Sequence, residues 1–249
     1  MSAAAVLGAH RWTAEETRIL VRAAHWAPRR WLRGEWPLEV RGDGVDLVER
    51  PGDDSRGRLV ACGMLLVHLE VSMRALGWLP ETELSHDDAD PRRIARITAA
   101  TRKRPDAGDL ASFGAMSGRA SYSAHGLPIL GVDEEPADGV RVKPLSPRQI
   151  RSLPKVGGAI ARTIAPPGEE PGDPWSAFLI TTESEARHHL VRAGQVAQRI
   201  RLLVTESGFR CSTVTEPFDP PKVRVSLFGL AGLPGIPQLA VGVHHARRR

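Results

Sequence analysis

Near its N-terminus the chain reads APRRWLRGEWPLEV, a stretch whose side chains could bind an anion beside an aromatic surface. Arg29, Arg30 and Arg33 supply guanidinium donors, which bind phosphate and carboxylate groups through charge-assisted hydrogen bonds. Trp31 and Trp36 supply flat rings for stacking. The residue types alone leave three interpretations open: a nucleic-acid contact, a pocket for a small anion, and a binding site that has lost its original residues.

Two pairs of neighbouring histidines, His188-His189 and His244-His245, raise the question of a metal site. Adjacent residues on a helix point about 100° apart and do not chelate from one face, so His188 and His189 are interpreted as solvated and no metal is expected. The sequence contains no G-x-S-x-G, G-x-x-x-x-G-K-[ST] or H-E-x-x-H motif. Triad hydrolases, P-loop enzymes and zincins are therefore excluded as starting hypotheses.

The chain has 249 residues and a net charge of +5, and only four of its 34 basic residues are lysines. This charge is small for the length, so it does not favour nucleic-acid binding. Cys62 and Cys211 lack C-x-x-C spacing and are expected to be free thiols. The N-terminus lacks a signal-peptide pattern, and no apolar run reaches the roughly 18 residues of a membrane span. A cytoplasmic protein without membrane contact is expected.

Hydrophobic periodicity predicts the elements of the first half. Thr13 and Glu16 form a capping box before a helix that continues to about residue 25. Apolar segments flanking Gly42-Asp43-Gly44 predict a hairpin of strands 38–40 and 45–48. RLVACGMLLVHLEVSMRALGW predicts a buried helix of about five turns. We expect a short strand at 82–84 and a second helix in PRRIARITAATRK, with Pro91 at its first position.

The second half begins with a weaker signal. Residues 104–174 are expected to be loop-rich, although GVRVKPL predicts a strand and SPRQIRSL a brief helix capped by Ser146. AFLITT and QLAVGVHH predict buried strands. Ser184 is expected to cap a long helix that ends at Gly208. The order of elements predicts an α+β protein with two long buried helices, and the sequence shows no internal repeat.

Two long segments resemble the Acg family of FMN-binding nitroreductase-like proteins. Residues 61–78, ACGMLLVHLEVSMRALGW, resemble the family's S-C-G-A-A-L-x-x-L-x-x-A-x-x-A-x-G-W helix. Residues 179–219 resemble its L-x-A-G-Q-A-x-x-R-x-L-L-x-A-T-x-x-G helix with the preceding strand. Residues 235–249 are similar to its closing G-Y-P-Q-x-x-x-R-x-G strand, and residues 21–40 fall where the family has R-A-A-x-x-A-P-S-x-H-N-x-Q-P-W.

The resemblance gives the opening stretch a meaning, because in the nitroreductase fold this segment lies against the flavin. The family's Ser, Asn and Gln side chains supply hydrogen bonds there, and this sequence keeps only Pro28 and Trp36. The replaced positions are Arg29 for Ser, Trp31 for His, Leu32 for Asn and Gly34 for Gln. The pocket is either rebuilt around arginine and tryptophan or degenerate, with the arginines solvated and the tryptophans packed under a neighbouring subunit.

A rebuilt pocket would bind the FMN phosphate through arginines and the ring through a stacking wall. Arg22 matches the family's arginine near the phosphate, and the C-terminal arginines match a basic stretch of the family. The resemblance therefore implies these cofactor contacts: Arg22, Pro28, Arg29, Arg30, Trp31, Arg33, Trp36, Arg247 and Arg248.

The resemblance implies a single nitroreductase-like domain over residues 1–249, with a mixed, largely antiparallel sheet flanked by long buried helices. It implies an FMN-dependent oxidoreductase that uses NAD(P)H to reduce a nitro, quinone or similar small-molecule acceptor, with no catalytic side chain assigned. The alternative is a non-catalytic flavin-binding or flavin-sequestering protein, or a degenerate partner subunit. Because the chain is shorter than the family in residues 104–174, a homodimer or a complex with a related subunit is expected.

Overall fold

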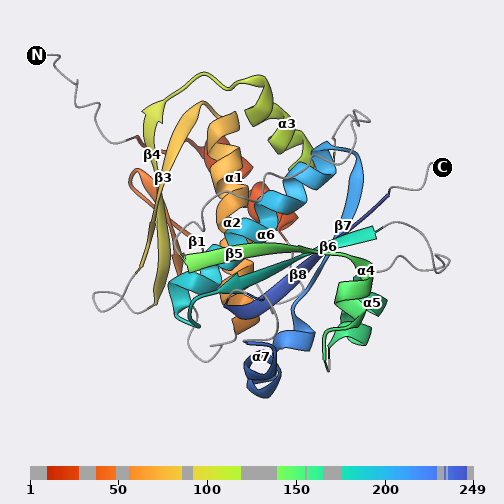
Figure 1. Ribbon diagram of the computed structural model, residues 1–249. Coiled ribbons are helices and arrows are strands. Elements are labelled where there is room, and N and C mark those ends of the chain that lie inside the picture. Colours follow the sequence, from red (N-terminus) through yellow and green to blue (C-terminus); the bar gives the residue numbers. More distant parts are fainter. Residues whose placement is uncertain are drawn as a thin grey trace, which may run out of the picture.

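The computed structural model describes residues 10–27, 38–48, 56–85, 92–118, 139–154, 156–164, 175–228, 233 and 235–245. Within these ranges the chain forms helices and two four-stranded sheets in which every pairing is antiparallel (Figure 1). The α+β class is confirmed, and the expected sheet is divided into two.

The first half contains one sheet and three helices. Its elements are α1 (Ala14–Trp26), β1 (Leu38–Arg41), β2 (Gly44–Val48), α2 (Arg56–Ala75), β3 (Trp78–Leu84), β4 (Arg93–Arg102) and α3 (Ala107–Met116). The predicted capping box is present, because Thr13 Oγ1 accepts from Glu16 N at 3.2 Å and Glu16 Oε2 accepts from Thr13 N at 2.9 Å. The hairpin and the long buried helix are also confirmed.

Strand β4 corrects the helix expected from PRRIARITAATRK. Its buried residues alternate with Arg96 and Thr98, which is the two-residue period of a strand. Arg96 Nη1 donates to Asp46 Oδ1 of the neighbouring strand at 3.0 Å, and its Nη2 donates to Asp43 Oδ1 at 3.0 Å. Pro91 suggested the start of a helix, but the alternation of buried and partly exposed residues and the cross-strand ion pairs are those of a strand.

The second half contains the other sheet. Its elements are β5 (Val140–Leu145), α4 (Pro147–Arg151), α5 (Gly157–Ile164), β6 (Trp175–Thr182), α6 (Arg187–Glu206), β7 (Phe209–Val214), η2 (Glu216–Phe218), α7 (Pro221–Leu227) and β8 (Ile236–His245). Ser146 caps α4 as predicted. The predicted cap at Ser184 is wrong, because α6 begins two residues later than expected, after Ala186. Ser184 Oγ instead accepts from Ala186 N at 3.2 Å and bonds His189 Nδ1 at 2.7 Å.

The two halves repeat one topology although the sequence shows no repeat. The strand orders are β1-β2-β4-β3 and β5-β6-β8-β7, and in each half a 20-residue helix joins the second strand to the third. Helices α2 and α6 pack against each other, α2 contacting the first sheet and α6 the second (Figure 1). They touch at Gly63 and Gly194, where a Cβ on either glycine would lie 1.9 Å from a carbonyl oxygen of the other helix.

The largest core cluster fills the space between the sheets around α2 and α6. Strand β6 alternates between two cores, because Phe178 and Ile180 belong to this cluster while Ala177 and Leu179 pack in a second one with α4, α5 and α7. Burial on both faces explains why its sequence reads as a continuous apolar run. Within the described ranges, none of the helices combines the length and apolar character that crossing a bilayer requires.

Candidate functional sites

Arg22 is the one predicted cofactor contact that the structure places. It lies on the exposed face of α1, whose opposite face buries Leu20, Ala23 and Ala24. Among the described residues Arg22 has no carboxylate partner, so its guanidinium group is available to an anion.

The remaining predicted contacts lie outside the described residues: Pro28, Arg29, Arg30, Trp31, Arg33, Trp36, Arg247 and Arg248. The described chain stops at Ala27, which is 3% exposed, and resumes at Leu38, which packs against the same core. Both ends of the arginine- and tryptophan-rich segment are therefore anchored to the central core.

The donor chemistry of this predicted set fits one part of FMN better than the other. The set contains six arginines, counting Arg22, and guanidinium groups suit a dianionic phosphate. Leu32 and Gly34 stand where the resemblance implies an amide side chain, so they offer no side-chain hydrogen bond to the ring. The residues fit the phosphate, and the ring would depend on tryptophan stacking.

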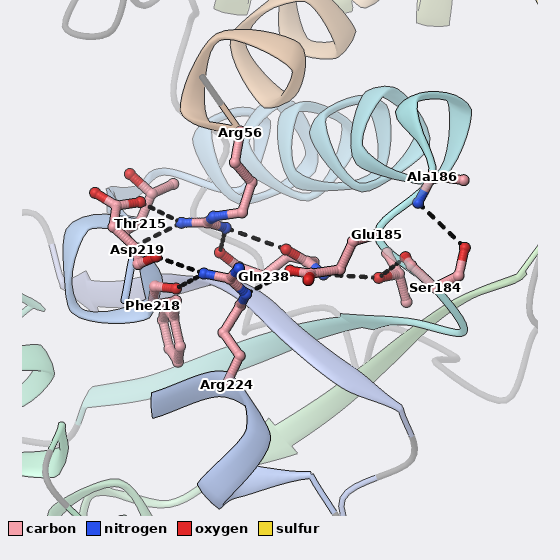
Figure 2. A network of polar contacts seen from close by, with 10 residues as sticks. Arg56, Ser184, Glu185, Ala186, Thr215, Phe218, Asp219, Arg224 and Gln238 are labelled. Carbon is pink, nitrogen blue, oxygen red and sulfur yellow. Dashed lines mark hydrogen bonds and ion pairs between the residues drawn. The ribbon is translucent and has the colours of Figure 1, made fainter. Parts of the chain in front are cut away.

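The partly exposed Arg56 and the buried Arg224 form a polar network at the start of α2 (Figure 2). Arg56 donates to the backbone oxygens of Gln238 at 2.5 Å and Thr215 at 3.1 Å, and to Asp219 Oδ1 at 2.5 Å. Burial lowers the pKa of Arg56, and the positive charge of Arg224 adds to this effect. Because its terminal nitrogens are occupied by protein atoms, Arg56 ties α2 to the second sheet rather than binding a ligand.

Arg224 completes this network from α7. Its Nη1 donates to the backbone oxygens of Phe218 at 2.7 Å and Asp219 at 2.5 Å, and its Nε lies 2.5 Å from Glu185 Oε1. The carboxylates of Glu185 and Asp219 face solvent over about half their surface, at 44% and 55%. Their partial exposure lets water share the solvation of the two cations.

His68 is a buried histidine that the sequence analysis did not single out. Its Nδ1 bonds the backbone oxygen of Ala23 at 3.1 Å, and its Nε2 has no partner among the described residues. Burial lowers the pKa of His68 to about 4, and the nearby Arg201 contributes in the same direction. His68 is therefore neutral at pH 7 and joins α1 to α2.

Among the described residues, His188, His189 and the two cysteines form no reactive centre. His188 and His189 are half-buried with ring centroids 4.2 Å apart, so the prediction that they are solvated is wrong. In the part of the chain that the structure describes, no three His, Cys, Asp or Glu side chains gather as metal ligands. Cys62 and Cys211 are free thiols as predicted, and burial raises the pKa of Cys211, which disfavours the reactive thiolate.

A cavity of about 260 Å³ lies between α2, α3 and α6. Its lining combines apolar residues with charges of both signs: Val67, Glu70, Val71, Arg74, Asp109, Ser112, Arg199, Leu202, Leu203 and Glu206. None of these residues is among the site residues predicted from the sequence. The available signal was Glu70 inside a buried helix, since a buried carboxylate needs partners from other elements.

Comparison with known proteins finds a distant similarity to proteins named as nitroreductases. The chain is similar to two proteins of Mycobacterium tuberculosis, strains CDC 1551 / Oshkosh and ATCC 25618 / H37Rv, each named "Putative NAD(P)H nitroreductase". In each comparison 25% of residues are identical over 265 aligned positions, which cover 83% of this chain and 77% of the relative. No model of a protein family matches the chain.

Proposed function

We propose that the protein is an FMN-dependent, nitroreductase-like oxidoreductase that uses NAD(P)H to reduce a nitro, quinone or similar acceptor. The similarity to two proteins named as NAD(P)H nitroreductases, extending over 83% of the chain, carries this proposal. The two-sheet α+β fold with its paired central helices is consistent with it.

The chain's own residues would bind and orient the cofactor. Arg22, Arg29, Arg30 and Arg33 would hold the phosphate through charge-assisted hydrogen bonds, with Arg247 and Arg248 contributing from the C-terminus. Trp31 and Trp36 would form the stacking wall and exclude water, and Pro28 would fix the backbone where α1 ends. Bound FMN would supply the redox chemistry, accepting reducing equivalents from NAD(P)H and passing them to the acceptor.

A second function is favoured by a specific observation. Leu32 and Gly34 replace two polar positions of the family pattern, and this loss is expected in a flavin-sequestering protein or a degenerate partner subunit. In that case the chain would act in a homodimer or with a related subunit. Light scattering of the purified protein at several concentrations tests the oligomeric part directly.

The deciding experiment is an absorbance spectrum of the purified full chain, taken before and after adding FMN and desalting. If the proposal holds, the visible bands of oxidised flavin survive desalting, and NAD(P)H is then consumed in the presence of a nitro or quinone acceptor. Bands that survive without NAD(P)H consumption favour the sequestering protein. A chain that stays colourless refutes flavin binding altogether.

Two substitutions test the phosphate contacts. Arg22→Ala and Arg29→Ala should each weaken FMN binding by about 1–3 kcal/mol, because each removes a charge-assisted hydrogen bond. Arg18→Ala is the matched control, since Arg18 is exposed on the same helix as Arg22. Unchanged FMN titrations for both test variants would remove these arginines from the site.

A further inference from the structure

The cavity between α2, α3 and α6 selects a small ligand with an apolar body. Val67, Val71, Leu202 and Leu203 supply the apolar part of its lining. Its volume of about 260 Å³ lies just below the roughly 300–1,000 Å³ of pockets that hold drug-sized molecules. An occupant of metabolite size is therefore the best match, and it must place apolar atoms against these side chains.

Two carboxylates on the cavity wall each keep a free oxygen. Ser112 Oγ donates to Glu206 Oε1 at 2.7 Å. Asp109 Oδ2 accepts from Asp106 N at 3.1 Å and from Lys103 Nζ at 3.5 Å. Among the described residues neither Glu206 Oε2 nor Asp109 Oδ1 has a protein donor. Asp109 is only 9% exposed and already pairs through Oδ2 with the half-exposed Lys103, so its other oxygen offers an acceptor rather than an unpaired charge.

Two arginines on the same lining keep free donors. Arg199 Nη2 donates to Glu70 Oε2 at 3.1 Å, whereas Glu70 Oε1 already accepts from Thr82 and Gln195. Glu70 thus accepts three bonds and holds Arg199 in place, while the other guanidinium nitrogens of Arg199 have no partner in the described part of the chain. Arg74 also has no hydrogen-bond or ion-pair partner within the described ranges.

We propose that this cavity binds a small apolar zwitterion of the α-amino-acid class. Its ammonium group would bond Glu206 and Asp109, its carboxylate would bond Arg74 and Arg199, and its side chain would pack on the valines and leucines. A ligand with a single charge would bond either the two carboxylates or the two arginines. The other two side chains would carry a charge of the same sign as the ligand, which disfavours binding. This site is independent of the proposed flavin chemistry.

Calorimetric titration of the purified full chain tests the proposal with three matched probes. L-Leucine is the zwitterion, 3-methylbutylamine lacks its carboxylate, and 4-methylpentanoate lacks its ammonium group. L-Phenylalanine extends the test to a larger side chain. Each is added to roughly 10 mM, because ligands of this size bind with modest affinity. We expect saturable binding of at least one amino acid, and at least tenfold weaker binding of the two analogues.

Two variants connect that binding to the cavity. Arg74→Met removes an exposed charge that has no partner among the described residues, and Glu206→Gln keeps the Oε1 acceptor for Ser112. Each should weaken amino-acid binding tenfold or more at unchanged melting temperature. Arg18→Met and Glu15→Gln, exposed on α1, are the matched controls and should bind like the unaltered chain.

Three results would overturn the proposal. The first is the absence of saturable binding for both amino acids. The second is an amine or acid analogue that binds as tightly as L-leucine, which would show that either the carboxylates or the arginines alone are enough for binding. The third is amino-acid binding that neither Arg74→Met nor Glu206→Gln changes, which would place the ligand elsewhere. None of these measurements requires bound FMN, so they test the amino-acid site independently of the proposed oxidoreductase function.

Discussion

The crossing of α2 and α6 depends on two glycines, and alanine at either one should destabilise the fold. At Gly63 a Cβ would lie 1.9 Å from the backbone oxygen of Val191, and at Gly194 it would lie 1.9 Å from that of Val60. Both obstacles are backbone atoms of long helices, so no side chain can turn away. The helices must move apart until the contact exceeds 3.0 Å, a displacement of about 1 Å.

The size of the effect follows from two opposing contributions. Alanine in place of glycine favours a helix interior by about 1 kcal/mol. Forcing an extra methyl into a packed core costs about 1–3 kcal/mol and occasionally more, and here the displacement extends along two 20-residue helices at the centre of the largest core cluster. We expect the cost of the clash to lie at the upper end of this range or above it, because two backbones must separate, so that each variant loses about 2 kcal/mol net or more.

Urea denaturation followed by far-UV circular dichroism measures this loss. Gly158→Ala in α5 is the matched control, because its Cβ would meet only the tip of Arg162 at 3.5 Å, an ordinary contact. The control should be neutral or slightly stabilising. If Gly63→Ala and Gly194→Ala are as stable as the control variant, the close approach of the two helices is wrong, and with it the arrangement of the core.

Further predictions concern the buried charges. His68 has a folded-state pKa of about 4 against roughly 6.5 when unfolded, so the unfolded chain binds the extra proton between these values. The neutral His68 side chain contributes to the free energy of unfolding above pH 6.5, and this contribution is lost as the pH falls toward 4. The full loss is about 3 kcal/mol. Stability measured from pH 7 to 4 should fall more steeply for the unaltered chain than for His68→Gln, and parallel curves would refute this. Arg56→Met leaves buried carbonyls unpaired and should cost about 2–5 kcal/mol. Asp219→Asn should cost under about 1 kcal/mol, because Asp219 is half-exposed. Equal losses in urea melts would show that the ion pair rather than carbonyl bonding stabilises this network.

Local sequence signals predicted those elements whose stabilising contacts lie within the element itself. The capping boxes at Thr13 and Ser146 involve a side chain and a backbone group three residues apart, so their pattern is readable directly. The same signal was present but unused at Asp106, whose carboxylate accepts from Asp109 N at 2.8 Å at the start of α3. Frequent glycine and proline around this cap favoured a loop interpretation.

Contacts between distant segments account for the elements that were missed. Helix α5 begins with two glycines, which disfavour a helix, and Gly157 is required because a Cβ there would lie 2.4 Å from the backbone oxygen of Ile150. Strand β4 was mistaken for a helix because its pairing with β2, which contains Asp46, is not visible in a local window. Tertiary packing overrides local preference in both places.

The cavity could not have been predicted from sequence for the same reason. Glu70 is held by Thr82, Gln195 and Arg199, and two of these partners lie more than a hundred positions away along the chain. Most of the predicted flavin contacts, in contrast, lie close together in one short stretch of the sequence. Their roles remain predictions. A local cluster is easy to find in a sequence, whereas a site assembled from three helices requires the fold.

The internal repeat and the cavity are connected through the helix crossing. Gly63 is the eighth residue of α2 and Gly194 the eighth residue of α6, so the helices touch at equivalent points. All cavity residues on both helices lie beyond this crossing, toward the C-terminal ends, and α3 supplies the third wall. Within the described ranges α3 has no counterpart after β8, so the repeat is broken where the cavity closes. The symmetric pair of helices thus borders an asymmetric cavity, because among the described elements the covering helix α3 belongs to the first half.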